Sequence, residues 1–178
     1  MLQENLISKK FLYPALLILL IVPLQASFSE EYYTIFKKDS WAVESVKYAK
    51  NDYGCIMFNG DSDLELRVFA DNNGMDLSIF YDNRPEINKS LKYFSFRIDD
   101  YMNWRDSGSY YDEGWLISDF ANYSDKDGDD FVREFRKGKK FYHLDDNYEV
   151  ISWFSLNGSS MASDAFAECI ERKGNYWD

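Results

Sequence analysis

The chain has 178 residues, which is enough for one domain with a hydrophobic core. Its formal net charge is −11, and 19% of its residues are aromatic. Because a chain this acidic repels phosphate backbones and anionic membrane surfaces, its composition argues against nucleic acid as a partner.

The N-terminal segment has the pattern of a secretory signal peptide. Lys9 and Lys10 precede the apolar run FLYPALLILLIV, and Ala26 offers a small residue at a cleavage point. The alternative is a membrane anchor, but the run is shorter than the roughly 20 apolar residues that a bilayer core requires. We therefore expect residues 1–26 to be removed on export to the periplasm or on secretion. Residues 27–178 are then expected to form a single β-rich domain with no integral membrane segment.

After a short lead-in at residues 27–39, runs of residues alternate between apolar and polar side chains. A period of two is typical of strands that keep one face in water, and turn clusters such as DNNG separate the runs. The segment 82–90 is expected to be a loop. The expected strands are 41–49, 54–59, 64–70, 75–81, 92–99, 115–121, 139–144 and 148–156. The pattern predicts a mainly β fold, an antiparallel β-sandwich or curled sheet of about eight strands.

The segment DDYMNWRDSGSYYDEGW, residues 99–115, is predicted to be a long polar loop and is the best candidate for a binding site. Aromatic rings with polar groups are typical anchors at binding surfaces. The alternative is that the two tryptophans pack at the edge of the sheet. The candidate partner-binding residues are Trp104, Tyr110, Tyr111, Asp112 and Trp115.

Three alternating aspartates, Asp125, Asp127 and Asp129, resemble the first ligands of a calcium-binding loop. Two requirements of such a loop fail, because Asp130 stands where the turn glycine belongs and Arg136 stands where the bidentate glutamate belongs. The three aspartates are therefore only weak candidates for a metal site.

Acidic residues precede Phe131 and basic residues follow it, which favours a short helix near that position. Asp129 or Asp130 would cap its start, cations would complement its dipole at the far end, and Gly138 would terminate it. The alternative is a strand, because FVREF also alternates.

A second helix is predicted at the C-terminus, with Ser159 or Ser160 as its cap and Gly174 as its terminator. One apolar face of this helix consists of Met161, Ala162, Ala165, Phe166, Cys169 and Ile170. The chain's two cysteines are Cys55 and Cys169, and in an oxidising compartment they most simply form one disulfide between an early strand and this helix. The alternative is two free, buried thiols.

No sequence motif of catalysis is evident. His143 is the only histidine and falls inside an expected strand. The sequence therefore argues against a zinc site with histidine ligands and against a Ser-His-acid triad. The chain has no nucleophile elbow, phosphate loop or dinucleotide fingerprint. Glycoside hydrolysis by a pair of carboxylates is an alternative that the sequence leaves open, because acidic residues are spread along the chain. We expect a protein that is not an enzyme and that requires no cofactor.

The order of these features resembles a known family. A Trp-led first strand, a cysteine in the second, the strand FSFRID, a helix ending in RKGKK and the closing motif FSLNGSSMASDAFAEC follow one another. This order is similar to that of the invasion-associated locus B family of periplasmic proteins. A periplasmic accessory protein family of type VI secretion has a related ending, and its Arg-x-Asp strand is similar to Arg97 and Asp99. The resemblance implies an exported, virulence-associated bacterial β-rich domain without catalytic residues.

The sequence thus predicts an exported binding protein that acts through protein contact. Removal of residues 1–26 takes away Glu4, Lys9 and Lys10, so the net charge changes from −11 to −12. This charge suits a basic partner, including a cationic hydrolase or toxin that the protein would inhibit or assist. The alternatives are a carbohydrate-binding or glycan-acting envelope protein that uses the loop 99–115, and a structural envelope protein with no discrete ligand.

Overall fold

The computed structural model describes residues 30–50, 52–60, 63–72, 74–82, 84–119 and 125–176. The expected signal peptide lies outside these residues. Within the described ranges, no helix has both the length and the apolar character needed to cross a membrane.

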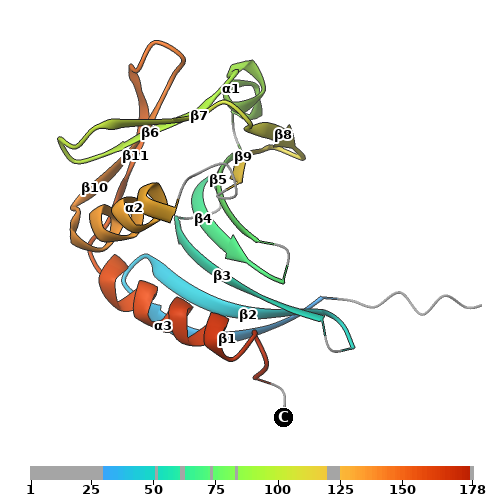
Figure 1. Ribbon diagram of the computed structural model, residues 1–178. Helices are drawn as coiled ribbons and strands as arrows, with labels where there is room; N and C mark the ends of the chain where they lie inside the picture. Colours follow the sequence, from blue (N-terminus) through green and yellow to red (C-terminus); the bar gives the residue numbers. More distant parts are fainter. Residues whose placement is uncertain are drawn as a thin grey trace, which may run out of the picture.

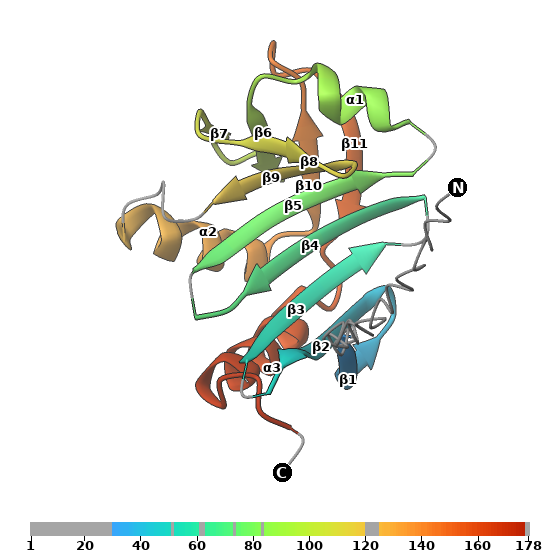
Figure 2. The ribbon, with the colours of Figure 1, turned by 90° about the vertical axis from the view of Figure 1, so that its right-hand side faces the viewer.

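The described residues form two antiparallel sheets of seven and four strands with three helices (Figures 1 and 2). The larger sheet has the order β1-β2-β3-β4-β5-β9-β8, and Figure 2 shows these strands side by side. Its strands are β1 (Glu31–Lys38), β2 (Trp41–Ala49), β3 (Asp52–Gly60), β4 (Leu64–Ala70), β5 (Met75–Tyr81), β8 (Tyr110–Asp112) and β9 (Trp115–Asp119). The smaller sheet has the order β11-β10-β6-β7, from β6 (Phe94–Ile98), β7 (Asn103–Asp106), β10 (Lys140–Leu144) and β11 (Val150–Ser155). The helices are α1 (Pro85–Ser90), α2 (Asp125–Lys137) and α3 (Ser159–Glu171). The predicted mainly β, antiparallel fold with a C-terminal helix is confirmed.

Three of the expected segments differ from the structure. The expected lead-in contains the edge strand β1. Most of its residues are exposed to solvent and it has a bulge between Thr34 and Phe36, so apolar and polar residues do not alternate clearly along it. The expected loop at 82–90 contains α1, which starts at Pro85, a residue suited to a first helical position. The expected loop at 99–115 contains β7 and β8, so the described chain has eleven strands instead of about eight.

The core lies between the two sheets and extends under the helices. Phe96 of β6 is its aromatic centre, because its ring lies 5.0 Å from that of Phe141, 5.7 Å from that of Trp104 and 5.7 Å from that of Phe131. Phe131 belongs to α2, which lies between the two sheets in Figure 1. Burial of these large rings against one another is the main source of stability here, because aromatic side chains remove the most apolar surface from water.

The helix near residue 131 is confirmed, but it starts at Asp125 instead of near residue 130. The prediction that Asp129 or Asp130 caps it is therefore wrong, since both residues lie inside the helix. Its end agrees with the prediction, because the helix stops at Lys137 and the Gly138 N–H donates to the Glu134 carbonyl oxygen at 2.7 Å.

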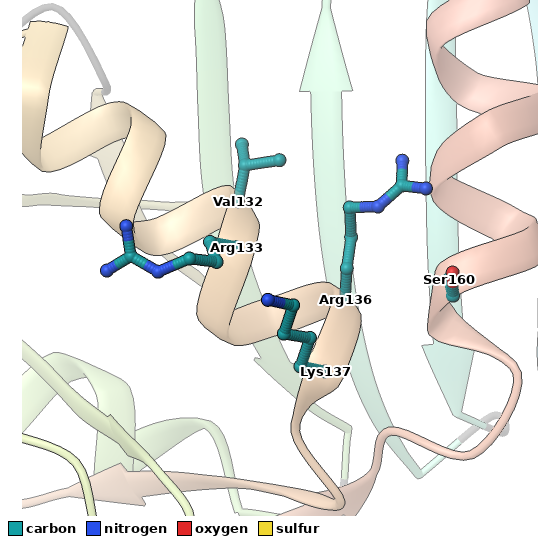
Figure 3. A pocket seen from close by; sticks show the side chains of 5 residues that line it. All are labelled: Val132, Arg133, Arg136, Lys137 and Ser160. Atoms are coloured by element: carbon teal, nitrogen blue, oxygen red, sulfur yellow. The ribbon is translucent and has the colours of Figure 1, made fainter.

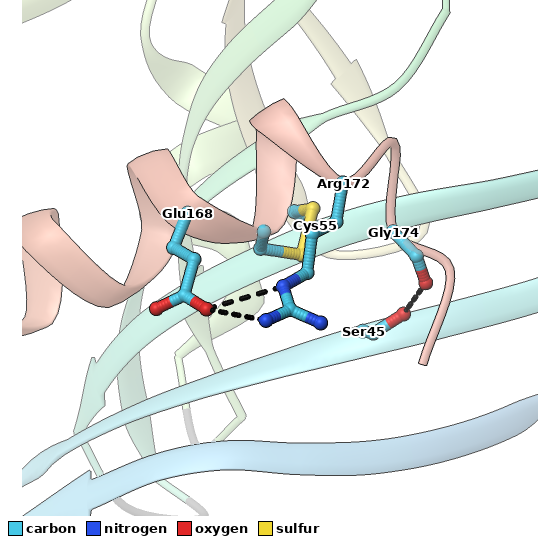
Figure 4. Close-up of a disulfide and its surroundings, with 6 residues drawn as sticks. Ser45, Cys55, Glu168, Arg172 and Gly174 are labelled. Carbon is cyan, nitrogen blue, oxygen red and sulfur yellow. Dashed lines mark hydrogen bonds and ion pairs between the residues drawn. A yellow bond between two sulfur atoms is a disulfide. The ribbon is translucent and has the colours of Figure 1, made fainter. Parts of the chain in front are cut away.

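The disulfide between Cys55 and Cys169 is present, with 6.0 Å between its Cα atoms, and joins β3 to α3 (Figure 4). The same figure shows the Ser45 hydroxyl donating to the Gly174 carbonyl oxygen just after α3 ends. These links hold the C-terminal end of α3 on the inner face of the larger sheet.

The start of α3 differs from the prediction that Ser159 or Ser160 would cap it. Gly158 is the N-cap residue, in a left-handed conformation with φ +92°, and no side chain caps the helix. The buried Ser159 hydroxyl instead donates to the Phe135 carbonyl oxygen at 2.9 Å, which ties α3 to α2.

Replacement of both cysteines by alanine is expected to lower the free energy of unfolding by up to about 4.7 kcal/mol, the chain-entropy value for a loop of about 100 residues. The bridged residues are 114 positions apart, so the closed loop is of this size. Urea unfolding of the oxidised protein and of the double variant measures the difference. Addition of a reductant should destabilise the wild type alone; equal urea midpoints for the two oxidised proteins would contradict this role.

Candidate functional site

The structure divides the five predicted binding residues between two sheets. Trp104 lies on β7 of the smaller sheet and is only 5% exposed. Its indole Nε1–H donates to the Glu134 carboxylate at 3.1 Å, and its ring stacks on that of Phe96. Trp104 is therefore a core residue, in line with the packing alternative, and its ring is not available to a partner.

Trp115 lies on the outer face of the larger sheet, where it is half-buried. The Arg67 guanidinium lies 4.2 Å from its ring centroid, and the Phe80 ring lies 5.0 Å away on the neighbouring strand. Arg67 also pairs with Glu65 at 2.8 Å. Trp115 thus forms part of a packed cluster on the sheet surface, which leaves only one part of its ring open.

The other three predicted residues, Tyr110, Tyr111 and Asp112, form the short edge strand β8 and are exposed. Tyr110 is 51% exposed and Tyr111 40%. Two large rings that stay open to solvent on a sheet edge are suited to contact with a partner.

Tyr110 opens onto an acidic surface feature that we call the aspartate hollow. It has a volume of about 270 Å³ and is lined by Phe69, Asp71, Gly74, Asp76, Tyr110 and Asp119. The register of β5 and β9 places Asp76 directly opposite Asp119. Like charges in that position repel one another.

Two ionisable side chains of the hollow have raised pKa values. The pKa of Asp76 is raised, first by burial and then by the charges of Asp119 and Asp71. The pKa of Tyr110 is raised by burial and then by Asp76, Asp112 and Asp119. Asp76 has no ion pair within the described residues, and no cation lowers its pKa. A cation from outside would therefore stabilise the charge of Asp76.

The three aspartates of the hollow were not among the predicted site residues. They come from the β4–β5 turn and from two strands that pair only after the chain has passed through the smaller sheet. Aspartate is rare in strands. Aspartates at outward positions of β5 and β9 were the one sequence feature from which Asp76 and Asp119 could have been predicted as site residues.

Asp125, Asp127 and Asp129 lie on the backbone of α2, where helical geometry replaces the extended loop that a calcium site of the expected type requires. Their side chains are outside the described part of the structure. Among the side chains that are described, no group of three or more histidine, cysteine, aspartate or glutamate residues could hold a metal ion.

His143 belongs to a buried polar chain that links the two sheets. Its Nδ1 lies 2.9 Å from the Tyr81 hydroxyl, which also bonds to the Ser152 hydroxyl. Burial lowers the pKa of His143 to about 3 and raises the pKa of Tyr81 to about 12, so both groups are neutral at physiological pH. His143 is fully buried, so this chain acts in the packing of the sheets.

Comparison with protein family models, with curated proteins and with solved structures returned no match.

Trp104→Phe is expected to lower the free energy of unfolding by about 1–3 kcal/mol, because it leaves the buried Glu134 carboxylate without its donor. Urea unfolding measures the loss. Trp115→Phe is the matched control and should cost less, since Trp115 is half-buried on the sheet surface. A larger cost for Trp115→Phe than for Trp104→Phe would contradict these assignments.

His143 is expected to make the protein less stable in acid. The pKa of His143 is lower in the folded state than in the unfolded state, so between about pH 6.5 and 3 only the unfolded state binds a proton there. The free energy of unfolding therefore falls in this range by up to about 1.4 kcal/mol for each pH unit. Urea unfolding at several pH values measures this slope. His143→Asn should flatten the slope relative to the wild type, while carboxylates titrate alike in both proteins. Parallel curves would show that His143 does not titrate on unfolding.

Proposed function

We propose that the chain is an exported, non-enzymatic binding protein that holds a basic segment of a protein partner against the aspartate hollow. The observation that carries this proposal is the juxtaposition of Asp71, Asp76 and Asp119 with the exposed ring of Tyr110 around one depression. The raised pKa of Asp76 supports it. Burial raises this pKa most, the charges of Asp119 and Asp71 raise it further, and a bound cation would offset the repulsion from those charges.

The dimensions of the hollow suit one basic side chain. Its volume of about 270 Å³ lies below the roughly 300–1,000 Å³ of sites for drug-sized molecules. A lysine or arginine can place its charge beside Asp76 and its stem against Phe69. The ring of Tyr110 then offers its face to the cation, a contact that strengthens as water leaves.

Export is supported by the signal-peptide pattern and by the disulfide, because disulfides persist mainly in oxidising compartments. The resemblance to invasion-associated locus B proteins also supports an exported domain without catalysis. A partner that is a cationic hydrolase or toxin would then be inhibited or assisted from the surface around β8.

The glycan alternative relies on the same edge strand, but with fewer residues than the sequence suggested. Trp104 is buried, which leaves Tyr110 and Tyr111 as the exposed rings of the predicted site. A neutral sugar would stack on these rings with little dependence on salt, whereas a basic segment depends on charge.

Asp76→Asn is expected to weaken the binding of an oligoarginine peptide about tenfold, a difference of about 1.4 kcal/mol, because it removes the central charge of the hollow. Isothermal titration calorimetry at low and physiological salt measures the dissociation constant. Glu86→Gln is the matched control, since it removes the same charge from an exposed position on α1.

Equal losses in Asp76→Asn and Glu86→Gln would contradict the hollow as the site, because they would reflect only the overall charge. A natural partner is sought by capture from an envelope extract on the wild type and on Asp76→Asn in parallel. A basic protein retained by the wild type alone supports the proposal, and binding that is insensitive to salt counts against it.

A further inference from the structure

A second depression lies on the other face of the larger sheet, between α2 and α3. We call it the helix cleft. Its volume is about 180 Å³, and its lining is apolar except for Ser163 and Arg136. Val132 and Ile170 belong to it and are 43% and 44% exposed, so the cleft opens to solvent. The remaining lining residues are Met57, Val68, Met75, Phe131, Phe135, Phe166 and Ala167.

The helix cleft is separate from the aspartate hollow. Successive side chains of a strand point to opposite faces of the sheet. Val68 and Met75 point into the cleft, while their neighbours Phe69 and Asp76 line the hollow. A ligand in the cleft would therefore leave the proposed protein-binding site free.

A basic rim adjoins the helix cleft and shares Val132 and Arg136 with it. This wider depression, about 590 Å³, is lined by Val132, Arg133, Arg136, Lys137 and Ser160. Figure 3 shows Arg136 extending from α2 towards α3, with Arg133 and Lys137 on the same helix. Apolar surface and positive charge thus meet at one place on an acidic protein.

Among the side chains that the structure describes, two of the three rim cations pair with carboxylates. Arg133 pairs with Asp130 at 2.6 Å, and Arg136 pairs with Asp164 at 2.6 Å. Lys137 has no carboxylate partner in the part of the chain that the structure describes. The Asp164 side chain is 63% exposed, and such surface pairs contribute little, so a ligand carboxylate can replace it at Arg136.

We propose that the helix cleft binds a small monocarboxylate with an aliphatic tail. The tail lies among Met57, Phe135 and Phe166, and the carboxylate lies at Arg136, the cation that lines both the cleft and the rim. A dry cavity of about 150 Å³ already holds a benzene ring, so the cleft accommodates a tail of about six to eight carbons. A cationic amphiphile of the same length is rejected by the rim, because a like charge would lie beside Arg136.

The test is a titration of the purified, oxidised protein with butanoate, hexanoate and octanoate, followed by calorimetry and by the amide shifts of α2 and α3. Each methylene that enters the cleft should raise the affinity about fourfold, the value expected for burial of one such group. Octan-1-amine is the control for charge, and acetate is the control for binding by the rim alone.

Variants separate the two halves of the site. Ala167→Phe fills the cleft from an exposed position on α3 and should abolish octanoate binding without removing a core contact. Arg136→Gln should weaken binding about tenfold. Lys126→Gln is the matched control, because Lys126 is a cation of the same helix that is 83% exposed and lies outside the rim.

Saturable binding that rises with chain length and is lost in Ala167→Phe supports the proposal. Failure of octanoate to bind, equal binding of octan-1-amine, or undiminished binding in Ala167→Phe would overturn it. Binding of the oligoarginine peptide should be the same in the wild type and in Ala167→Phe, so failure at the cleft and failure at the aspartate hollow remain distinguishable.

Discussion

The inner face of the seven-stranded sheet must be shielded from water, and the rest of the structure follows from how this is achieved. The four-stranded sheet covers only part of it, and α3 covers β1 to β3. The second helix, α2, closes the space between them with Phe131 and Phe135. The helix cleft is the part of this junction that stays open.

Buried polar groups fix how the two sheets lie relative to one another, which apolar burial alone does not specify. The Tyr81 hydroxyl bonds to both His143 and Ser152, and so joins β5 to β10 and β11. On the other side, the Ser118 hydroxyl donates to the Asp106 carboxylate at 2.8 Å and joins β9 to β7. Buried groups of this kind are costly when unpaired, so they favour one relative position of the two sheets over others.

Much of the fold could be predicted from the sequence, because alternation is a local property. The strands at 41–49, 64–70 and 75–81 agree with β2, β4 and β5 at both ends, and the disulfide followed from there being only two cysteines. The helices were harder. Nothing local indicates that Asn88 of α1 would be buried by donating to the Ile79 and Gly114 carbonyl oxygens at 2.7 and 2.9 Å.

The candidate site could be predicted only in part, because its residues are brought together by strand pairing. Trp104 and Tyr110 are close neighbours in sequence, yet the chain crosses between them from one sheet to the other. No local pattern distinguishes the core tryptophan from the exposed tyrosine. Likewise, the repulsion between Asp76 and Asp119 exists only in the register of β5 with β9.

The same pairing shows why net charge is an incomplete guide to partners. The overall charge of −11 suggests a uniformly acidic surface. The fold instead places three aspartates on the outer face of the larger sheet and three cations of α2 at its inner side. Fields from exposed charges decay over about 8 Å at physiological salt, so each face interacts with its surroundings largely on its own. Under the two proposals above, a basic group would bind on one face and an anionic group on the other, with each contact set by local geometry.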